Sequence, residues 1–128
     1  MLFDHTLVLA DNQSVTSDAA GTVDSAAKVI QAGGDDYSTT WVAVVVKTAL
    51  AGAGSVDVIL QTSDAAAFST PTNLHTVTLT ATNGVKGAVL AYRLPLGLKK
   101  YTRVYLDVTG TLTAGNVTVG LTDGIWTK

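Results

Sequence analysis

Residues 100–109 (KYTRVYLDVT) alternate in character without interruption, and this stretch most constrains the fold. A period of two is typical of a half-buried β-strand, because successive side chains point to opposite faces. One row must then face a core; it comprises Thr102, Val104, Leu106 and Val108. The opposite row comprises Tyr101, Arg103, Tyr105 and Asp107. Tyrosine and arginine are enriched in protein contacts. Tyrosine is also a good strand former, so the row is equally compatible with a plain outer face.

The rest of the chain repeats this pattern. The sequence contains no glutamate and is rich in threonine, valine and glycine, which disfavours helices and favours strands. Turn signals recur at intervals of roughly 8 to 12 residues, as in a sandwich or barrel. Strands are expected at residues 6–10, 19–23, 40–50, 55–63, 73–81, 85–95, 100–109 and 116–122. We therefore predict an all-β fold, a single-domain jelly-roll β-sandwich of about eight antiparallel strands.

Three local features add detail to this fold. Asn83-Gly84 is a tight-turn signal and predicts that residues 85–95 pair back onto residues 73–81. Residues 25–30 could form one helical turn with Asp24 as its cap. Phe68, in a loop, is expected to plug one end of the sandwich.

Length and charge limit the classes of partner. The 128 residues fit one domain, 1–128, in which residues 1–5 form an apolar arm carrying Leu2 and Phe3. A net charge of −2 argues against a nucleic-acid partner. The apolar run at residues 41–46 is too short to cross a bilayer, so no membrane partner is expected. The N-terminus does not resemble a signal peptide, and we expect a soluble protein made in a cytoplasm.

The sequence offers little for catalysis. It has no cysteine, only the histidines His5 and His75, and no serine in a nucleophile-elbow motif. Asp35, Asp36 and Asp64 lie in expected loops, but their spacing does not match a calcium-binding loop, and solvated turns are the better interpretation. We expect no enzyme activity, no catalytic residues, no cofactor and no metal.

A contact patch is the more promising feature. Arginine and lysine cluster around the stretch described first, with aromatic residues between them. Four cations are few for an oligonucleotide face, so an acidic protein surface is the better candidate partner. Together with the arm, the expected capsid or subunit interface comprises Leu2, Phe3, Arg93, Lys99, Lys100, Tyr101, Arg103 and Tyr105.

Four segments together resemble a known family. They are residues 1–16 (MLFDHTLVLADNQSVT), 56–64 (VDVILQTSD, followed by Phe68 and Ser69), 94–103 (LPLGLKKYTR) and 112–121 (LTAGNVTVGL). In their order and spacing they are similar to the capsid cement proteins of tailed bacteriophages, of the type first seen in a Bordetella phage. The resemblance runs from end to end and is weakest at residues 18–36.

The resemblance implies a non-enzymatic jelly-roll protein on the outer surface of an icosahedral virion. Such a capsid decoration protein bridges major capsid subunits and stabilises the shell, and it is made in the host cytoplasm. The expected partners are the major capsid protein and a second copy of the chain, with a homodimer favoured and a trimer possible. An alternative from the residues alone is a carbohydrate- or receptor-binding β-sandwich module of a virion, using Asp36, Tyr37, Trp41 and Trp126 as a platform.

Overall fold

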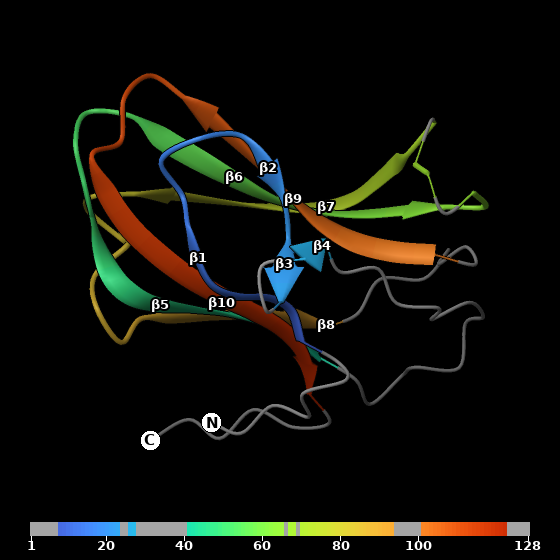
Figure 1. Cartoon of the computed structure of the whole chain (residues 1–128). Coiled ribbons are helices and arrows are strands. Elements are labelled where there is room, and N and C mark those ends of the chain that lie inside the picture. The colour runs from blue at the N-terminus through green and yellow to red at the C-terminus, as the bar shows by residue number, and fades with distance from the viewer. Residues whose placement is uncertain are drawn as a thin grey trace.

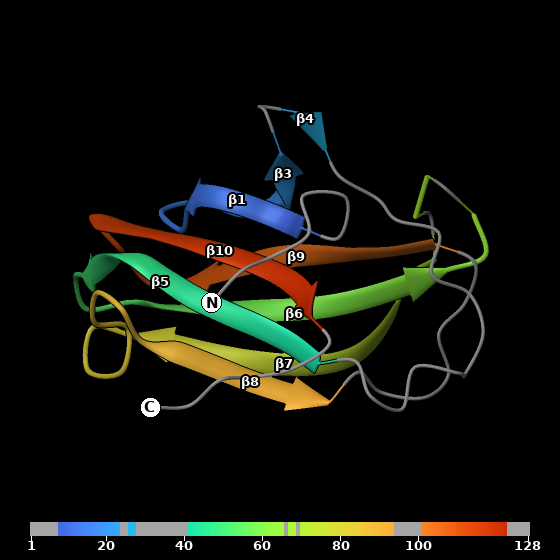
Figure 2. The same cartoon turned by 90° about the horizontal axis from the view of Figure 1, so that it is seen from below.

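The computed structural model describes residues 8–23, 26–27, 41–65, 67–68, 70–93 and 101–122. Two four-stranded antiparallel sheets pack face to face as two layers (Figure 1). Sheet A has the order β1 (Val8–Ser14), β10 (Ala114–Thr122), β5 (Trp41–Ala51) and β8 (Val89–Arg93). Sheet B has the order β2 (Ala19–Ala20), β9 (Tyr101–Thr109), β6 (Ser55–Ser63) and β7 (Thr72–Thr80). A small ribbon of β3 (Thr22–Val23) and β4 (Ala26–Ala27) stands beside them (Figure 2).

The strand pairs are nested, as in a long hairpin that has been rolled up. The innermost pair is β6 with β7, followed outward by β5 with β8, β2 with β9, and β1 with β10. Rolling also sets β10 against β5 and β9 against β6, which completes the two sheets. This arrangement of eight strands is a jelly roll, and the predicted fold class is confirmed.

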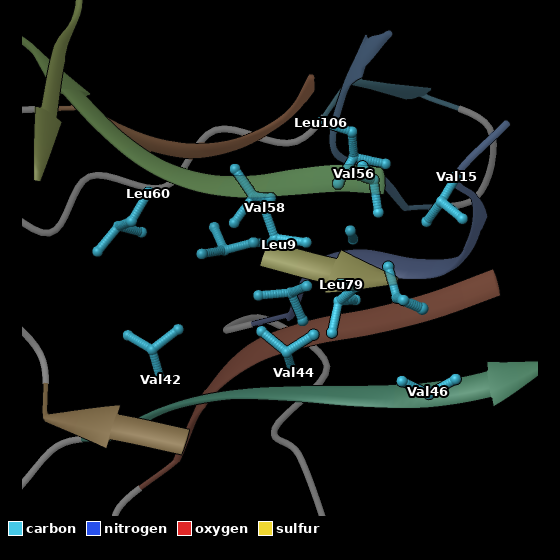
Figure 3. Packing of buried hydrophobic residues seen from close by; sticks show 14 of the residues in the cluster. Leu9, Val15, Val42, Val44, Val46, Val56, Val58, Leu60, Leu79 and Leu106 are labelled. Carbon is cyan, nitrogen blue, oxygen red and sulfur yellow. The ribbon is translucent and has the colours of Figure 1, made fainter. Parts of the chain in front are cut away.

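The core lies between the two layers and follows from the alternation of each strand (Figure 3). On β9, Val104 and Leu106 are buried and Val108 is half-buried, as predicted for the inner row. Val42, Val44 and Val46 face them from β5, the strand that is apolar on both faces. Other fully buried members are Leu9, Val15, Val56, Leu60, Leu79, Val117 and Val119.

The Asn83-Gly84 turn does not join a hairpin, so that prediction was wrong. β7 pairs with β6 and β8 pairs with β5, and the connection crosses from sheet B to sheet A. The Asn83 side chain ends β7 instead: its Oδ1 accepts from the Thr80 N–H at 2.7 Å and its Nδ2 donates to the Thr78 carbonyl at 3.0 Å. The Gly84 carbonyl accepts from the Leu50 N–H at 2.8 Å, which ties the loop to β5.

Two further local predictions are corrected near the N-terminus. The strand expected at residues 6–10 does not end at residue 10, because β1 continues through residues 11–13 to Ser14. It does so with register irregularities opposite β10 and a positive φ of 46° at Asn12, which a strand tolerates as a bulge. The expected helical turn at residues 25–30 is wrong where the structure describes it, because Ala26–Ala27 form β4.

Candidate interaction surfaces

The outer row of β9 lies on the exposed side of sheet B. Tyr101, Arg103 and Tyr105 are all half-buried, and Asp107 is exposed. On the neighbouring strand β6, Gln61 stands opposite Arg103, and Ile59 stands opposite Tyr105. The outer row of β9, which the alternating sequence predicts to face away from the core, therefore lies on the surface, and its aromatic residues are partly covered.

Arg103 packs against two aromatic rings. Its guanidinium carbon lies 4.3 Å from the Phe68 ring centroid and 5.4 Å from that of Tyr105. Its Nε donates to Gln61 Oε1 at 2.9 Å, and Gln61 Nε2 donates in turn to Asn73 Oδ1 at 3.0 Å. Burial lowers the pKa of the Arg103 guanidinium, and the neighbouring Tyr105 opposes that shift. The charge is thus fixed in place by stacking and a hydrogen bond while the side chain stays partly accessible.

Phe68 completes this clamp, in a different role from the predicted plug. The residue is 5% exposed and has a φ of 53°, but it does not belong to the core cluster between the sheets. Its ring stacks on Arg103, which projects from the outer side of sheet B. Sequence reasoning missed Gln61 and Ile59 as parts of this surface, because only the register of β6 against β9 brings them beside Arg103 and Tyr105.

The other end of the same face is acidic. Asp57 on β6 stands directly opposite Asp107 on β9. Thr78 donates its hydroxyl proton to Asp57 Oδ1 at 2.7 Å. Within the described ranges neither carboxylate has a cationic partner, so two like charges face each other across the strands.

Arg93 lies on a different surface from Arg103, which corrects the prediction of a single basic patch. It belongs to β8, an end strand of sheet A, and pairs in register with Trp41 of β5. Its guanidinium carbon is 5.5 Å from the Trp41 ring centroid. Because the adjacent Tyr92 faces the core, Arg93 points outward from sheet A, away from sheet B.

The outer face of sheet A is apolar beside Arg93. Val45 of β5 pairs with Val89 of β8, and Ala43 pairs with Ala91. Val89 is 46% exposed and Val85, in the preceding loop, is 52% exposed. This face therefore combines a cation stacked on an aromatic ring at one end of β8 with an exposed valine four residues away along the strand, which is again the composition of a protein contact.

The other predicted interface residues lie outside the described residues; they are Leu2, Phe3, Lys99 and Lys100. Among the described residues no group of three or more metal-binding side chains occurs. No helix in this part of the chain is long and apolar enough to span a membrane.

Comparison with protein families matches most of the chain. The family model Bbp16 matches residues 9–121, which covers the jelly roll from β1 to β10. A comparison with curated proteins finds no match. The chain belongs to the Bbp16 family, which carries the name of a Bordetella phage protein, and it is therefore a phage-related β-sandwich protein.

Proposed function

We propose that the protein is a capsid cement protein, which binds the outside of an icosahedral phage head and bridges neighbouring major capsid subunits. Membership of a phage-related family supports this proposal. So does the all-β sandwich, a rigid scaffold with two broad outer faces. The proposed location is the capsid surface, and the proposed partners are the major capsid protein and a second copy of the chain.

One structural observation supports the proposal in addition to membership of the family. Two surfaces that face away from each other both combine an arginine stacked on an aromatic ring with apolar neighbours. A protein that bridges subunits needs at least two contact surfaces, whereas a module that captures one ligand needs a single site. The Arg103 face and the Arg93 face meet that requirement.

Such a protein would act by mass action. It would bind the assembled shell in preference to loose subunits, and the assembly would gain the free energy of that binding. A protein that contacts several subunits of the shell makes its second contact at a high effective concentration. The overall affinity is therefore high even if each single contact is weak. No reaction chemistry is needed for this role.

The test is occupancy on purified, expanded shells of the parent phage. We expect the double variant Arg103→Glu with Tyr105→Ala to bind the shell at least tenfold more weakly, while its circular dichroism and unfolding temperature show an intact fold. The control is Thr111→Glu, because Thr111 is exposed in the β9–β10 connection at one end of the sandwich, on neither proposed face, and its replacement also adds a carboxylate. Normal occupancy of the double variant would make the β9 row plain surface. Capture by a glycan array and not by shells would replace the cement proposal with the receptor-binding alternative.

A further inference from the structure

We infer that the outer face of sheet B is self-complementary, and that a second copy of this chain docks on it about a two-fold axis passing beside Tyr105. This inference rests on the proposed function, in which a second copy of the chain is already a partner, and deepens it by naming the surface that joins the two copies. In such a dimer the two sheet A faces remain for neighbouring capsid subunits.

The charges on β9 are placed symmetrically about Tyr105. Arg103 lies two residues before it and Asp107 two residues after it, and all three share the outer row. At a rise of about 3.3 Å per residue, each charge is about 7 Å from Tyr105 along the strand. One strand therefore carries a fixed cation and an exposed anion at equal distances from an aromatic centre.

A two-fold axis has a specific effect on such a row. Consider an axis that lies in the contact plane, perpendicular to β9, at the level of Tyr105. Rotation reverses the direction of the second copy's β9 and turns its face toward the first. Each Arg103 then lies opposite Asp107 of the other copy, and the two Tyr105 side chains meet at the centre. The contact closes with one pair of copies, as an isologous interface must.

The remaining residues of the face suit this contact. Ile59 stands beside Tyr105 and is only 8% exposed, so it packs under the centre of the face, and the half-buried Tyr105 ring is the apolar group that a second copy would meet. Phe68 and Gln61 already hold the Arg103 guanidinium, so little side-chain freedom is lost on docking. At the acidic end, the facing pair of Asp57 and Asp107 is unfavourable in the single chain, and a cation from the second copy relieves it.

The face around Arg93 lacks this symmetry. Its neighbours on β5 and β8 are Trp41, Ala43, Val45, Val89 and Ala91, none of which carries a carboxylate. Two such faces brought together would place apolar side chains in contact, but none of these five residues supplies a carboxylate to meet the second arginine. Charge complementarity therefore selects sheet B for the second copy and leaves sheet A free for a different partner.

The experiment is sedimentation velocity of the isolated full chain over a range of concentrations. We expect the wild-type chain to form a dimer that weakens with added salt. Arg103→Asp or Asp107→Arg should each raise the dimer dissociation constant roughly 100-fold, since each replaces two attractive pairs by two repulsive ones and a factor of ten per pair is a modest value. Matched controls are Arg93→Asp on sheet A and Asp11→Arg on β1, which change charge equally and should leave the dimer intact.

Mixing the two defective variants gives the sharpest result. In a one-to-one mixture, the two carboxylates of the Arg103→Asp chain face the two guanidiniums of the Asp107→Arg chain, so a heterodimer should form although neither variant dimerises alone. The double variant carrying both substitutions should also dimerise. Loss of folding cannot produce these rescues, and only a two-fold contact predicts both.

Several results would overturn the inference. They are a wild-type chain that stays monomeric, single variants that dimerise like wild type, or a mixture without heterodimer when both variants are folded. Asp107 is exposed, so Asp107→Arg and the salt dependence carry the test even if Arg103→Asp fails to fold. Single variants that self-associate normally but lose shell binding would assign this face to the capsid.

Discussion

At the scale of single residues, Thr102 is an exception within a well-satisfied core. Its side chain is fully buried in the inner row of β9, and its Oγ1 has no hydrogen-bond partner in the described part of the protein. Thr62 stands opposite it on β6, equally buried, but donates its hydroxyl proton to the Tyr101 carbonyl at 2.9 Å. A buried hydroxyl without a partner costs free energy relative to an apolar group of the same shape.

We therefore expect Thr102→Val to stabilise the protein. The substitution is nearly isosteric and removes an unsatisfied polar atom, so the free energy of unfolding should rise by about 1 kcal/mol. Thr62→Val is the matched control and should lower it by about 1 kcal/mol, because it removes a hydrogen bond. Urea unfolding of both variants measures the two changes, and a loss of stability in Thr102→Val would show that its hydroxyl has a partner after all.

At the scale of elements, the β5–β6 turn depends on a close approach between two loops. Gly52 has a φ of +113°, and a Cβ there would lie 2.6 Å from the Thr111 carbonyl oxygen. The Gly54 N–H donates to that same carbonyl at 2.8 Å, and the Thr113 N–H donates to the Ala51 carbonyl at 2.8 Å. The turn is thus bound to the β9–β10 connection at one end of the sandwich.

Gly52→Ala should weaken this contact. Both the left-handed conformation and the steric overlap act against a side chain, and we expect a loss of about 2 kcal/mol in the free energy of unfolding. Gly87→Ala is the informative control, because Gly87 also has a positive φ, +87°, but nothing lies within 4 Å of its would-be Cβ. Equal losses in the two variants would mean that backbone strain acts alone and that the loop contact contributes nothing.

The strands and their pairing show most clearly which parts of the fold can be predicted from the sequence. The inner row of β9 could be predicted, because a period of two follows from strand geometry alone. The hairpin at Asn83-Gly84 could not, because a turn signal is local and does not determine which sheet the next strand joins. Arg93 and Arg103 were grouped for the same reason. They are close in sequence, but the chain changes sheet between them.

At the scale of the whole molecule, an aromatic contact joins the end strands of the two sheets. β7 and β8 are end strands of different sheets, and the rings of His75 and Tyr92 stack across the gap with centroids 4.0 Å apart. Burial raises the pKa of the Tyr92 phenol well above its ordinary value of 10.0. The folded state therefore keeps a proton that the unfolded chain releases near pH 10.

This linkage predicts a loss of stability in alkali. Below about pH 10 the phenol is protonated in both states, and its contribution is fully present. As pH rises above that value the unfolded state binds fewer protons, so the free energy of unfolding falls by up to about 1.4 kcal/mol per pH unit. Unfolding measured against pH should show this slope in the wild type, and Tyr92→Phe should abolish most of it. Tyr105→Phe, at a less buried ring, is the control and should keep the wild-type slope. If Tyr92→Phe also kept the wild-type slope, the alkaline loss of stability would not come from Tyr92.

The nested pairing of the strands also sets an order of assembly. β6 and β7 are joined by a short loop and can pair early, whereas β1 cannot pair until β10, the last described strand, is present. Pairings between distant parts of a chain form slowly, because loop closure costs entropy before any contact forms. On the ribosome, β1 and β5 would both leave the exit tunnel long before the strand that lies between them. Until β10 has been made, β1 and β5 both present unpaired edges, so a newly made chain is most exposed to wrong pairing in that interval.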